Sequence, residues 1–339
     1  GFYKGIVSQI IRPNCGVLAS DNFNQDIRDV TTQPIWGVYY QNVIKYTHDV
    51  IVKTKDLPAR ANLYNMARIY QAFSFMILTD EYGDIPYSQG GAGYTDQVFF
   101  PVYDKQQDIY NDIIKELTEA GAALSTTGTI ETADLLYAGN INQWKKFANS
   151  LLLRAGMRLI KVDAAKAQAV ATAAIAAGVI TTNADNAAIR HDANFTHPIG
   201  GGLNGSEAAN FYLAKPFVDQ LKNTNDPRLS AIAVRYVGAK SGNDQTAGAG
   251  VTTADVQIGL PMGKDNGTAP AQATADGLAS FYDYSQADRR RILKVSTPAF
   301  LVTASQDLLL IAEASFRGWI STGTADQYFA DGIRAHMDQ

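Results

Sequence analysis

The sequence predicts a mainly α-helical protein whose helical hairpins are interrupted by one loop-rich, sparsely stranded insertion. In several segments apolar side chains recur every three or four residues, which is the pattern of a helix with one buried face. The clearest of these segments are 35–52, 62–79 and 142–161. From Thr181 to about Ala279, glycine, asparagine, aspartate and threonine are frequent instead. We therefore expect a single domain, with a helical body at about 1–180 and 297–339 and an irregular insertion at about 181–296.

The composition is that of an ordinary globular protein, with 46% hydrophobic and 18% charged residues among 339. The formal net charge of −4 leaves no basic surface for nucleic acid, so we expect no nucleic-acid partner. No run of about eighteen apolar residues predicts a membrane-spanning helix. The single cysteine, Cys15, permits no internal disulfide and is expected to be a buried, inert thiol.

In chain order, a weak helical pattern over 2–18 comes first. The helix over 35–52 follows, and its apolar seam is expected to bury three rings: Trp36, Tyr39 and Tyr46. Pro58 separates it from the most regular helix, which begins near Asn62 and ends at Gly83, so the two helices form an antiparallel hairpin. Pro86 then biases Ile85 away from the helical conformation and gives the chain a rigid exit.

The next helices carry signals at their ends. Asp104 and Gln107 resemble a capping box, in which two side chains satisfy the first backbone donors of a helix. Asp163 is expected to cap an alanine-rich helix, and Gly178 to end it, because glycine readily adopts the left-handed conformation found there.

The insertion carries few regular elements. We predict short extended pieces at 211–213 and 231–237 and a short helix from about Pro216. Helical patterns return at Thr303 and at about Thr324. No repeat of fixed period is present, which argues against a regular solenoid.

An acidic group follows the most regular helix. Asp80, Glu81 and Asp84 could supply the general acid and base of a glycoside hydrolase, since such enzymes use paired carboxylates. The alternative is that they cap and solvate the end of a buried helix. Paired carboxylates are common and only their separation in space is diagnostic, so we favour the structural interpretation.

One glycine motif is only weak evidence for a dinucleotide-binding site. Gly200, Gly202 and Gly205 satisfy G-x-G-x-x-G, with a possible helix after Ser206. A dinucleotide site needs a strand directly before this motif, and none is predicted there, so a flexible loop is the better interpretation.

No cofactor is expected. His191 and His197 have no metal-binding spacing, so we interpret them as exposed loop histidines. Asn22, Asn24 and Asp26 imitate the opening of a calcium loop, but the glycine and the closing glutamate of that loop are missing. A structural calcium ion elsewhere in these loops is the alternative.

Aromatic residues within the insertion suggest ligand binding. A ring can cover the apolar C–H face of a sugar while neighbouring polar groups bind its hydroxyls. The alternative is that these rings fix the insertion onto the helical body. The candidate contacts, chosen for their chemistry and loop context, are Phe195, His197, Tyr282 and Tyr284.

Several segments, taken together, resemble one family. Residues 79–88 read TDEYGDIPYS, residues 102–106 read VYDKQ, and residues 144–151 read WKKFANSL, with Arg154 and Arg158 behind them. Further matches are Asp134–Tyr137, Asp226–Arg228 and Ala312–Trp319. In this order they resemble the signatures of the SusD/RagB-like outer-membrane lipoproteins of Bacteroidetes, over most of the chain.

The resemblance implies a tetratricopeptide-like (SusD-like) helical scaffold on the outer cell surface and no enzymatic activity. It implies an oligosaccharide ligand, or a peptide in some members, handed to a SusC-like TonB-dependent transporter. Cys15 does not fit a lipobox, so the expected lipid anchor would come from residues upstream of this chain. The three alternatives are a peptide-binding member, a glycoside hydrolase using the acidic group, and a scaffold that binds only protein.

Overall fold

The computed structural model describes residues 10–11, 35–206, 208–246 and 248–339, which fall into two compact units. The helical unit comprises the described residues of 35–189 and 300–339. The loop unit comprises those of 190–299 together with residues 10–11. Each unit has its own core and is described here by itself.

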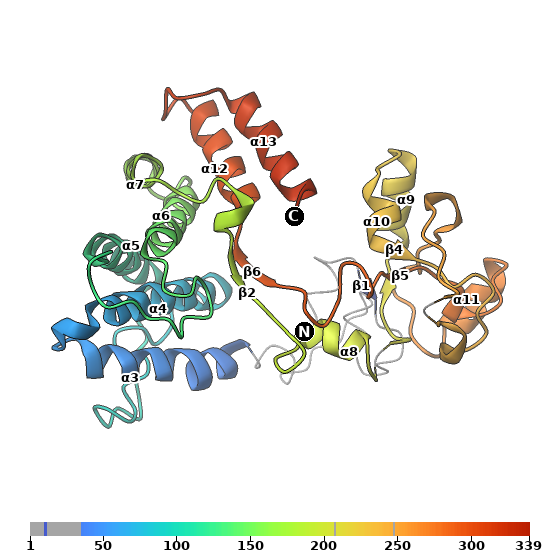
Figure 1. Ribbon diagram of the computed structural model, residues 1–339, viewed down its shortest axis with the longest axis horizontal. Coiled ribbons are helices and arrows are strands. Elements are labelled where there is room, and N and C mark those ends of the chain that lie inside the picture. Colours follow the sequence, from blue (N-terminus) through green and yellow to red (C-terminus); the bar gives the residue numbers. More distant parts are fainter. Residues whose placement is uncertain (1–9, 12–34, 207, 247) are drawn as a thin grey trace. The chain divides into compact units, whose positions relative to one another are not determined.

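The helical unit is built of helices that pack mainly on their neighbours along the chain, as the ribbon in Figure 1 shows. Its helices are α3 (Lys45–Thr54), α4 (Ala61–Tyr82), α5 (Gln106–Ala123), α6 (Ile141–Arg158), α7 (Ala164–Ala177), α12 (Ala304–Phe316) and α13 (Ala325–Met337). A helical turn at 35–38 and a π-helical segment, η1 (Tyr39–Ile44), precede α3. The prediction of a mainly α-helical protein built of helical hairpins is confirmed.

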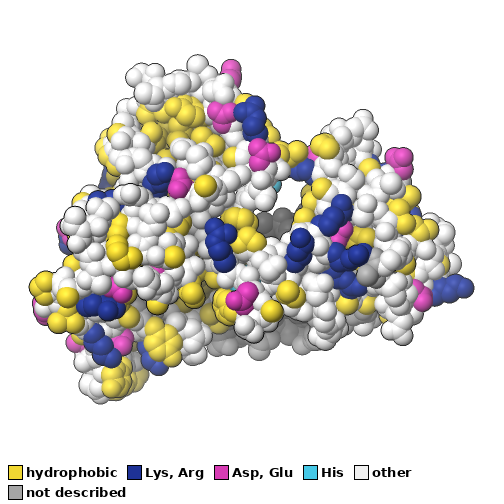
Figure 2. All heavy atoms as spheres, in the orientation of Figure 1, with side chains coloured by type: hydrophobic (Ala, Val, Ile, Leu, Met, Phe, Trp, Pro, Cys, Tyr) yellow, Lys and Arg dark blue, Asp and Glu magenta, His cyan; other side chains and the backbone are white. Residues whose placement is uncertain are grey.

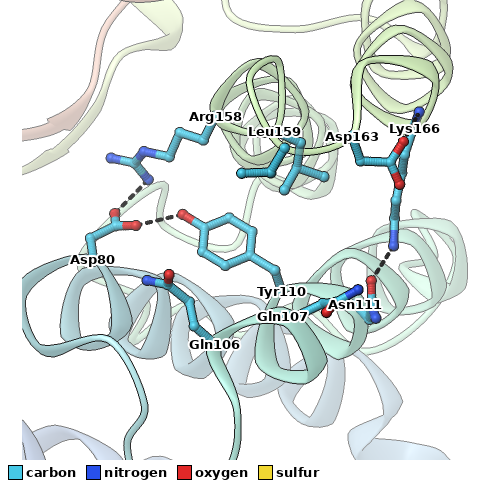
Figure 3. A pocket seen from close by; sticks show the side chains of 10 residues that line it. Asp80, Gln106, Gln107, Tyr110, Asn111, Arg158, Leu159, Asp163 and Lys166 are labelled. Atoms are coloured by element: carbon cyan, nitrogen blue, oxygen red, sulfur yellow. Dashed lines mark hydrogen bonds and ion pairs between the residues drawn. The ribbon is translucent and has the colours of Figure 1, made fainter.

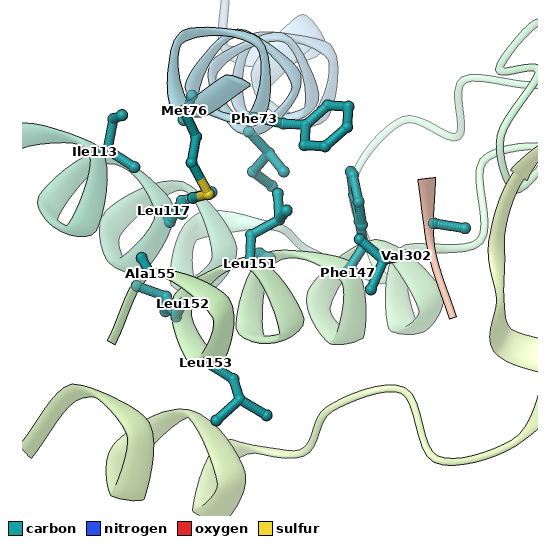
Figure 4. Close-up of a cluster of buried hydrophobic side chains, with 14 of the residues drawn as sticks. Phe73, Met76, Ile113, Leu117, Phe147, Leu151, Leu152, Leu153, Ala155 and Val302 are labelled. Atoms are coloured by element: carbon teal, nitrogen blue, oxygen red, sulfur yellow. The ribbon is translucent and has the colours of Figure 1, made fainter. Parts of the chain in front are cut away.

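The core of the helical unit is a continuous apolar cluster, to which η1, α4, α5, α6, α7 and α12 contribute buried side chains. Phe73 and Met76 of α4 pack with side chains of α5 and α6, as Figure 4 shows. The strand β6 (Ala299–Val302), which pairs with β2 (Ala187–Ile189), contributes Val302 to the same cluster. Almost every side chain labelled in Figure 4 is less than one-tenth exposed, so the scaffold is well packed.

The loop unit contains short elements joined by long connections. Its helices are α8 (Pro198–Leu203), α9 (Lys215–Asn223), α10 (Arg228–Ile232) and α11 (Ala269–Ala275). Its strands β1 (Ile10–Ile11), β3 (Tyr212–Leu213), β4 (Ala233–Val234) and β5 (Gln286–Ala287) form an antiparallel sheet in the order β1-β3-β5-β4. The extended pieces predicted at 211–213 and 231–237 correspond to β3 and β4.

The predicted helix ends are confirmed at α7. The Asp163 side chain accepts a hydrogen bond from the backbone N–H of Lys166, and Gly178 ends the helix with a φ of +95°. The helix predicted over 142–161 is three residues shorter at its end, because α6 stops at Arg158.

Three local predictions were wrong. Ile10 and Ile11 form a strand, whereas the pattern over 2–18 predicted helix; the rest of that segment, Cys15 and the loop at 22–26 lie outside the described residues. The glycine motif, which was interpreted as a flexible loop, begins inside a short helix, α8, and the possible helix after Ser206 is not present in the described residues 208–210. Asp104 does not cap α5, whose N-cap is Lys105 and which lacks a side-chain cap. The Asp104 carboxylate instead accepts hydrogen bonds from the backbone N–H groups of Tyr87 and Ser88, at 2.9 and 2.7 Å.

Tyr46 was expected in the core but is 57% exposed. The reason is the π-helical segment at Tyr39–Ile44, because a π turn contains an extra residue and so rotates everything that follows it about the helix axis. Ile44 consequently occupies the buried position and Tyr46 faces solvent.

Candidate functional site

The loop unit contains a small cluster of rings, His191, Phe195 and His197, which we call the aromatic cluster. Phe195 is exposed, whereas both histidines, expected to be exposed, are half-buried. The rings of Phe195 and His191 stack with centroids 5.0 Å apart and planes inclined by 18°. His197 meets His191 edge to face, also at 5.0 Å. Phe195 is 55% exposed, so one face of the stack is open to solvent.

Hydrogen bonds to the segment 294–297 fix the aromatic cluster. His191 Nδ1 lies 3.0 Å from the Thr297 carbonyl oxygen, and the backbone N–H of His197 donates to Val295 O at 2.7 Å. His197 Nδ1 accepts from the backbone N–H of Gly200 and so caps α8. A Cβ atom at Gly200 would clash with the Lys294 carbonyl oxygen, so only glycine allows this approach.

The loop that carries Phe195 is itself a closed turn. The Asp192 carboxylate accepts hydrogen bonds from the backbone N–H groups of Asn194 and Phe195, at 2.7 and 2.8 Å. The bond from the Phe195 N–H, followed by that from Asn194, lowers the pKa of Asp192. This turn fixes the backbone that carries the exposed ring.

Tyr282 belongs to a different cluster of the loop unit. Its ring stacks on Phe281 with centroids 4.1 Å apart, and it packs against a small core that includes Tyr236. The Gln245 side chain donates to its carbonyl oxygen, and the adjacent Asp283 forms a buried ion pair with Arg235 at 3.0 Å. Tyr282 is therefore half-buried and held rigidly.

Tyr284 is fully buried, and its hydroxyl donates to Asp276 at 2.5 Å. Burial raises its pKa, and the nearby Asp276 carboxylate adds to the effect. The ring has no exposed face and packs within the insertion. Of the four candidate contacts, Phe195 and His197 lie together through His191, while Tyr282 and Tyr284 lie in other clusters.

The helical unit has a cavity of about 510 Å³ beside the acidic group. Figure 3 shows Asp80 on its wall, between the hydroxyl of Tyr110 and the guanidinium of Arg158. The carboxylate lies 2.5 Å from the Tyr110 hydroxyl oxygen and 2.8 Å from Arg158 Nη1. On the opposite side Lys166 donates to Asn111. These side chains thus bind one another and join α4, α5, α6 and α7.

The other two acidic residues are no better placed for catalysis. The Asp84 carboxylate lies 2.6 Å from Lys105 Nζ and 3.0 Å from the backbone N of Gln106. Those two hydrogen bonds, that from Lys105 first, lower the pKa of Asp84, which is the opposite of what a general acid needs. Glu81 is exposed on the last turn of α4. Asp80 and Asp84 thus bind other side chains and backbone at the end of α4, as the favoured structural interpretation predicts for them.

Two features are absent from the part of the chain that the structure describes. Within it, no three His, Cys, Asp or Glu side chains gather so as to hold a metal ion. None of its helices combines the length and the apolar character needed to span a bilayer. On the face shown in Figure 2, lysine and arginine side chains are interspersed with aspartate and glutamate.

The described residues form a helical unit with a continuous core and a loop unit that exposes the ring of Phe195. A family model described as "Starch-binding associating with outer membrane" matches residues 5–339. The chain belongs to this SusD-like family, whose members are binding proteins rather than enzymes and are associated with the outer membrane.

Solved structures agree with this assignment. A chitin-binding protein is 29% identical with a TM-score of 0.81, over 99% of this chain and 69% of its own. A SusD-like protein of Bacteroidetes, AC2a, is 26% identical with a TM-score of 0.82, over 99% of this chain and 72% of its own. A chitin-binding SusD homologue from Flavobacterium johnsoniae shares the fold, at 24% identity and a TM-score of 0.77, over 100% of this chain and 65% of its own. A comparison with curated proteins found no match.

Proposed function

We propose that this protein captures an oligosaccharide at the cell surface through its loop unit and delivers it to a SusC-like TonB-dependent transporter. The observation that carries the proposal is the exposed face of Phe195, stacked on His191 and held by the Asp192 turn. A rigid ring bordered by imidazole groups suits a sugar, whose C–H face covers the ring while its hydroxyls bind the polar atoms.

The comparisons support this proposal in two ways. The family description names starch binding, and the relative at 29% identity is described as chitin-binding. A neutral glycan polymer is therefore the ligand class to test first. The description also places the family at the outer membrane, where a lipid anchor upstream of this chain would hold the protein beside its transporter.

Isothermal titration with a starch hexasaccharide, a chitin hexasaccharide and a peptide library tests the ligand. We expect one of the two sugars to bind and Phe195→Ala to weaken that binding about tenfold, the loss expected when one stacking ring is removed. Phe316→Ala is the matched control, because this ring of α12 is 84% exposed but lies outside the loop unit. Tyr282→Ala tests the second ring.

Each outcome has a defined meaning. Binding of peptides and of neither sugar would favour the peptide-binding alternative. Equal affinities of the Phe195→Ala and Phe316→Ala variants would remove the aromatic cluster from the proposal. Co-purification of a TonB-dependent transporter from cells expressing the full protein tests the delivery step, and its absence under conditions that preserve outer-membrane complexes would contradict it.

A further inference from the structure

The displaced tyrosine of the helical unit borders a cavity that the proposed function does not use. The cavity, of about 230 Å³, lies between α3 and the loop that follows α4. Tyr46 lines it from α3 and Tyr94 from the loop, and these two rings are 57% and 77% exposed. We call this cavity the tyrosine cleft.

The π-helical segment places Tyr46 there. Without the extra residue of the turn at Tyr39–Ile44, the apolar spacing of this helix would bury the Tyr46 ring in the seam. π turns cost hydrogen-bond geometry and occur frequently at functional sites. An exposed ring that is produced by an irregular turn is thus an unusual feature for a helix whose only role is packing.

A glycine brings the loop against α3 and so forms the other wall. Gly91 has a φ of +85°, and a Cβ atom there would lie 2.8 Å from the Cβ of His48 and 3.1 Å from the carbonyl oxygen of Ile44. Next to it, the hydroxyl of Thr95 lies 3.0 Å from His48 Nε2 and donates to Asp96 at 2.7 Å. These contacts hold the segment that carries Tyr94 close to the helix.

Polar groups complete the tyrosine cleft. Asp49 and Lys53, one turn apart on α3, form an ion pair at 2.9 Å, and the ammonium of Lys45 lies 5.1 Å from the centroid of the Tyr46 ring. The lining therefore combines two exposed rings with a carboxylate, two ammonium groups and a hydroxyl. Flat apolar faces next to charged and hydroxyl groups are the combination that binds one sugar ring, by stacking and by hydrogen bonds to its hydroxyls.

We infer that the tyrosine cleft is a second saccharide subsite, which binds one sugar residue of an oligosaccharide independently of the aromatic cluster of the loop unit. This inference rests on the proposed function, since the ligand class is the same.

The test uses Phe195→Ala as the background, so that binding through the aromatic cluster is already weakened. In that background, titration with starch and chitin hexasaccharides is expected to show residual binding, which Tyr94→Ala weakens about a further tenfold. Tyr94→Phe, which keeps the ring, should retain it. Phe100→Ala is the matched control, because this ring of the same loop is 95% exposed but does not line the cleft.

Failure of this inference and failure of the proposed function give different results. If the wild-type protein binds neither sugar, the proposed function is refuted, and the inference that the cleft is a saccharide subsite is refuted with it. If the wild type binds but Tyr94→Ala behaves like Phe100→Ala, the cleft is not a subsite while the proposed function stands. Tyr46→Ala checks the opposite wall, and circular dichroism of each variant shows whether the total helix content is unchanged.

Discussion

Asp307 gives this protein a stability that depends on pH in an unusual direction. The residue lies in α12, is fully buried, and accepts a hydrogen bond from the backbone N–H of Ile180 at 3.2 Å. Burial raises the pKa of its carboxyl from 3.8 to about 7, although a hydrogen bond with Ser150 and the charge of Arg154 act in the opposite direction.

The sign of the effect follows from proton binding. Between pH 3.8 and about 7 the folded protein keeps this proton while the unfolded chain has lost it. The free energy of unfolding therefore falls as pH rises through this interval, and the contribution that is complete below pH 3.8 is gone above about 7. A displacement of roughly three pKa units corresponds to about 4 kcal/mol.

Asp307→Asn removes this titration and replaces the carboxyl by a neutral group of the same shape. We expect the free energy of unfolding of the variant, relative to the wild type, to rise by about 3 kcal/mol between about pH 5 and 8.5. Urea unfolding at a series of pH values measures it. Asp226→Asn is the control, because hydrogen bonds with Arg228 lower the pKa of Asp226 and keep it ionised throughout this range. Parallel stability curves for the wild type and Asp307→Asn would refute the reasoning.

Two further substitutions test the site geometry. Gly200→Ala is expected to destabilise the loop unit by about 1–3 kcal/mol, because the new methyl group would clash with the Lys294 carbonyl oxygen. Gly248→Ala, which meets open space, should change stability by less than about 0.5 kcal/mol, and equal losses in denaturation would contradict the close approach. Asp80→Asn should cost about 1 kcal/mol through its pair with Arg158 and leave glycan affinity unchanged. Reducing ends released by the wild type but not by this variant would instead show that Asp80 is catalytic.

Local signals predicted the elements whose cause is local. The extent of α4 follows from its apolar spacing and from Gly83, and the ends of α7 from one capping aspartate and one glycine. In each case the residues that determine the conformation lie within a few positions of it. Such features can be predicted from one sequence without knowledge of the tertiary structure.

Three features of the structure could not be predicted from the spacing of residues in the sequence. Asp104 has the right spacing for a cap, but its carboxylate accepts hydrogen bonds from the backbone N–H groups of Tyr87 and Ser88. Tyr46 has the right spacing for the core, but η1 rotates it outward. Tyr284 sits in an irregular segment, yet its ring is buried and its hydroxyl reaches Asp276. Spacing alone carries no information on any of these contacts.

The candidate binding surface was predicted in part for the same reason. Phe195 and His197 were chosen because rings in loops are less often needed for core packing. In the structure both rings contact the ring of His191. His191 was identified as an exposed loop histidine, but nothing in its spacing shows that it supports a stack. Tyr94 was missed because its exposure depends on the fold of a glycine-containing loop.

The segments that identify the family do not identify the ligand, and the contacts made by their acidic residues show why. Asp80 of the TDEYGDIPYS stretch pairs with Arg158 of α6. Asp84 of the same stretch accepts a hydrogen bond from the backbone N–H of Gln106. Asp104 of the VYDKQ segment accepts one from the backbone N–H of Ser88. Many residues of these motifs thus bind one another or the helical scaffold. Their carboxylates at Asp80, Asp84 and Asp104 already have partners there. Under the proposed function, the side chains that select the ligand would then lie outside these motifs, and Phe195 is the first of them to test.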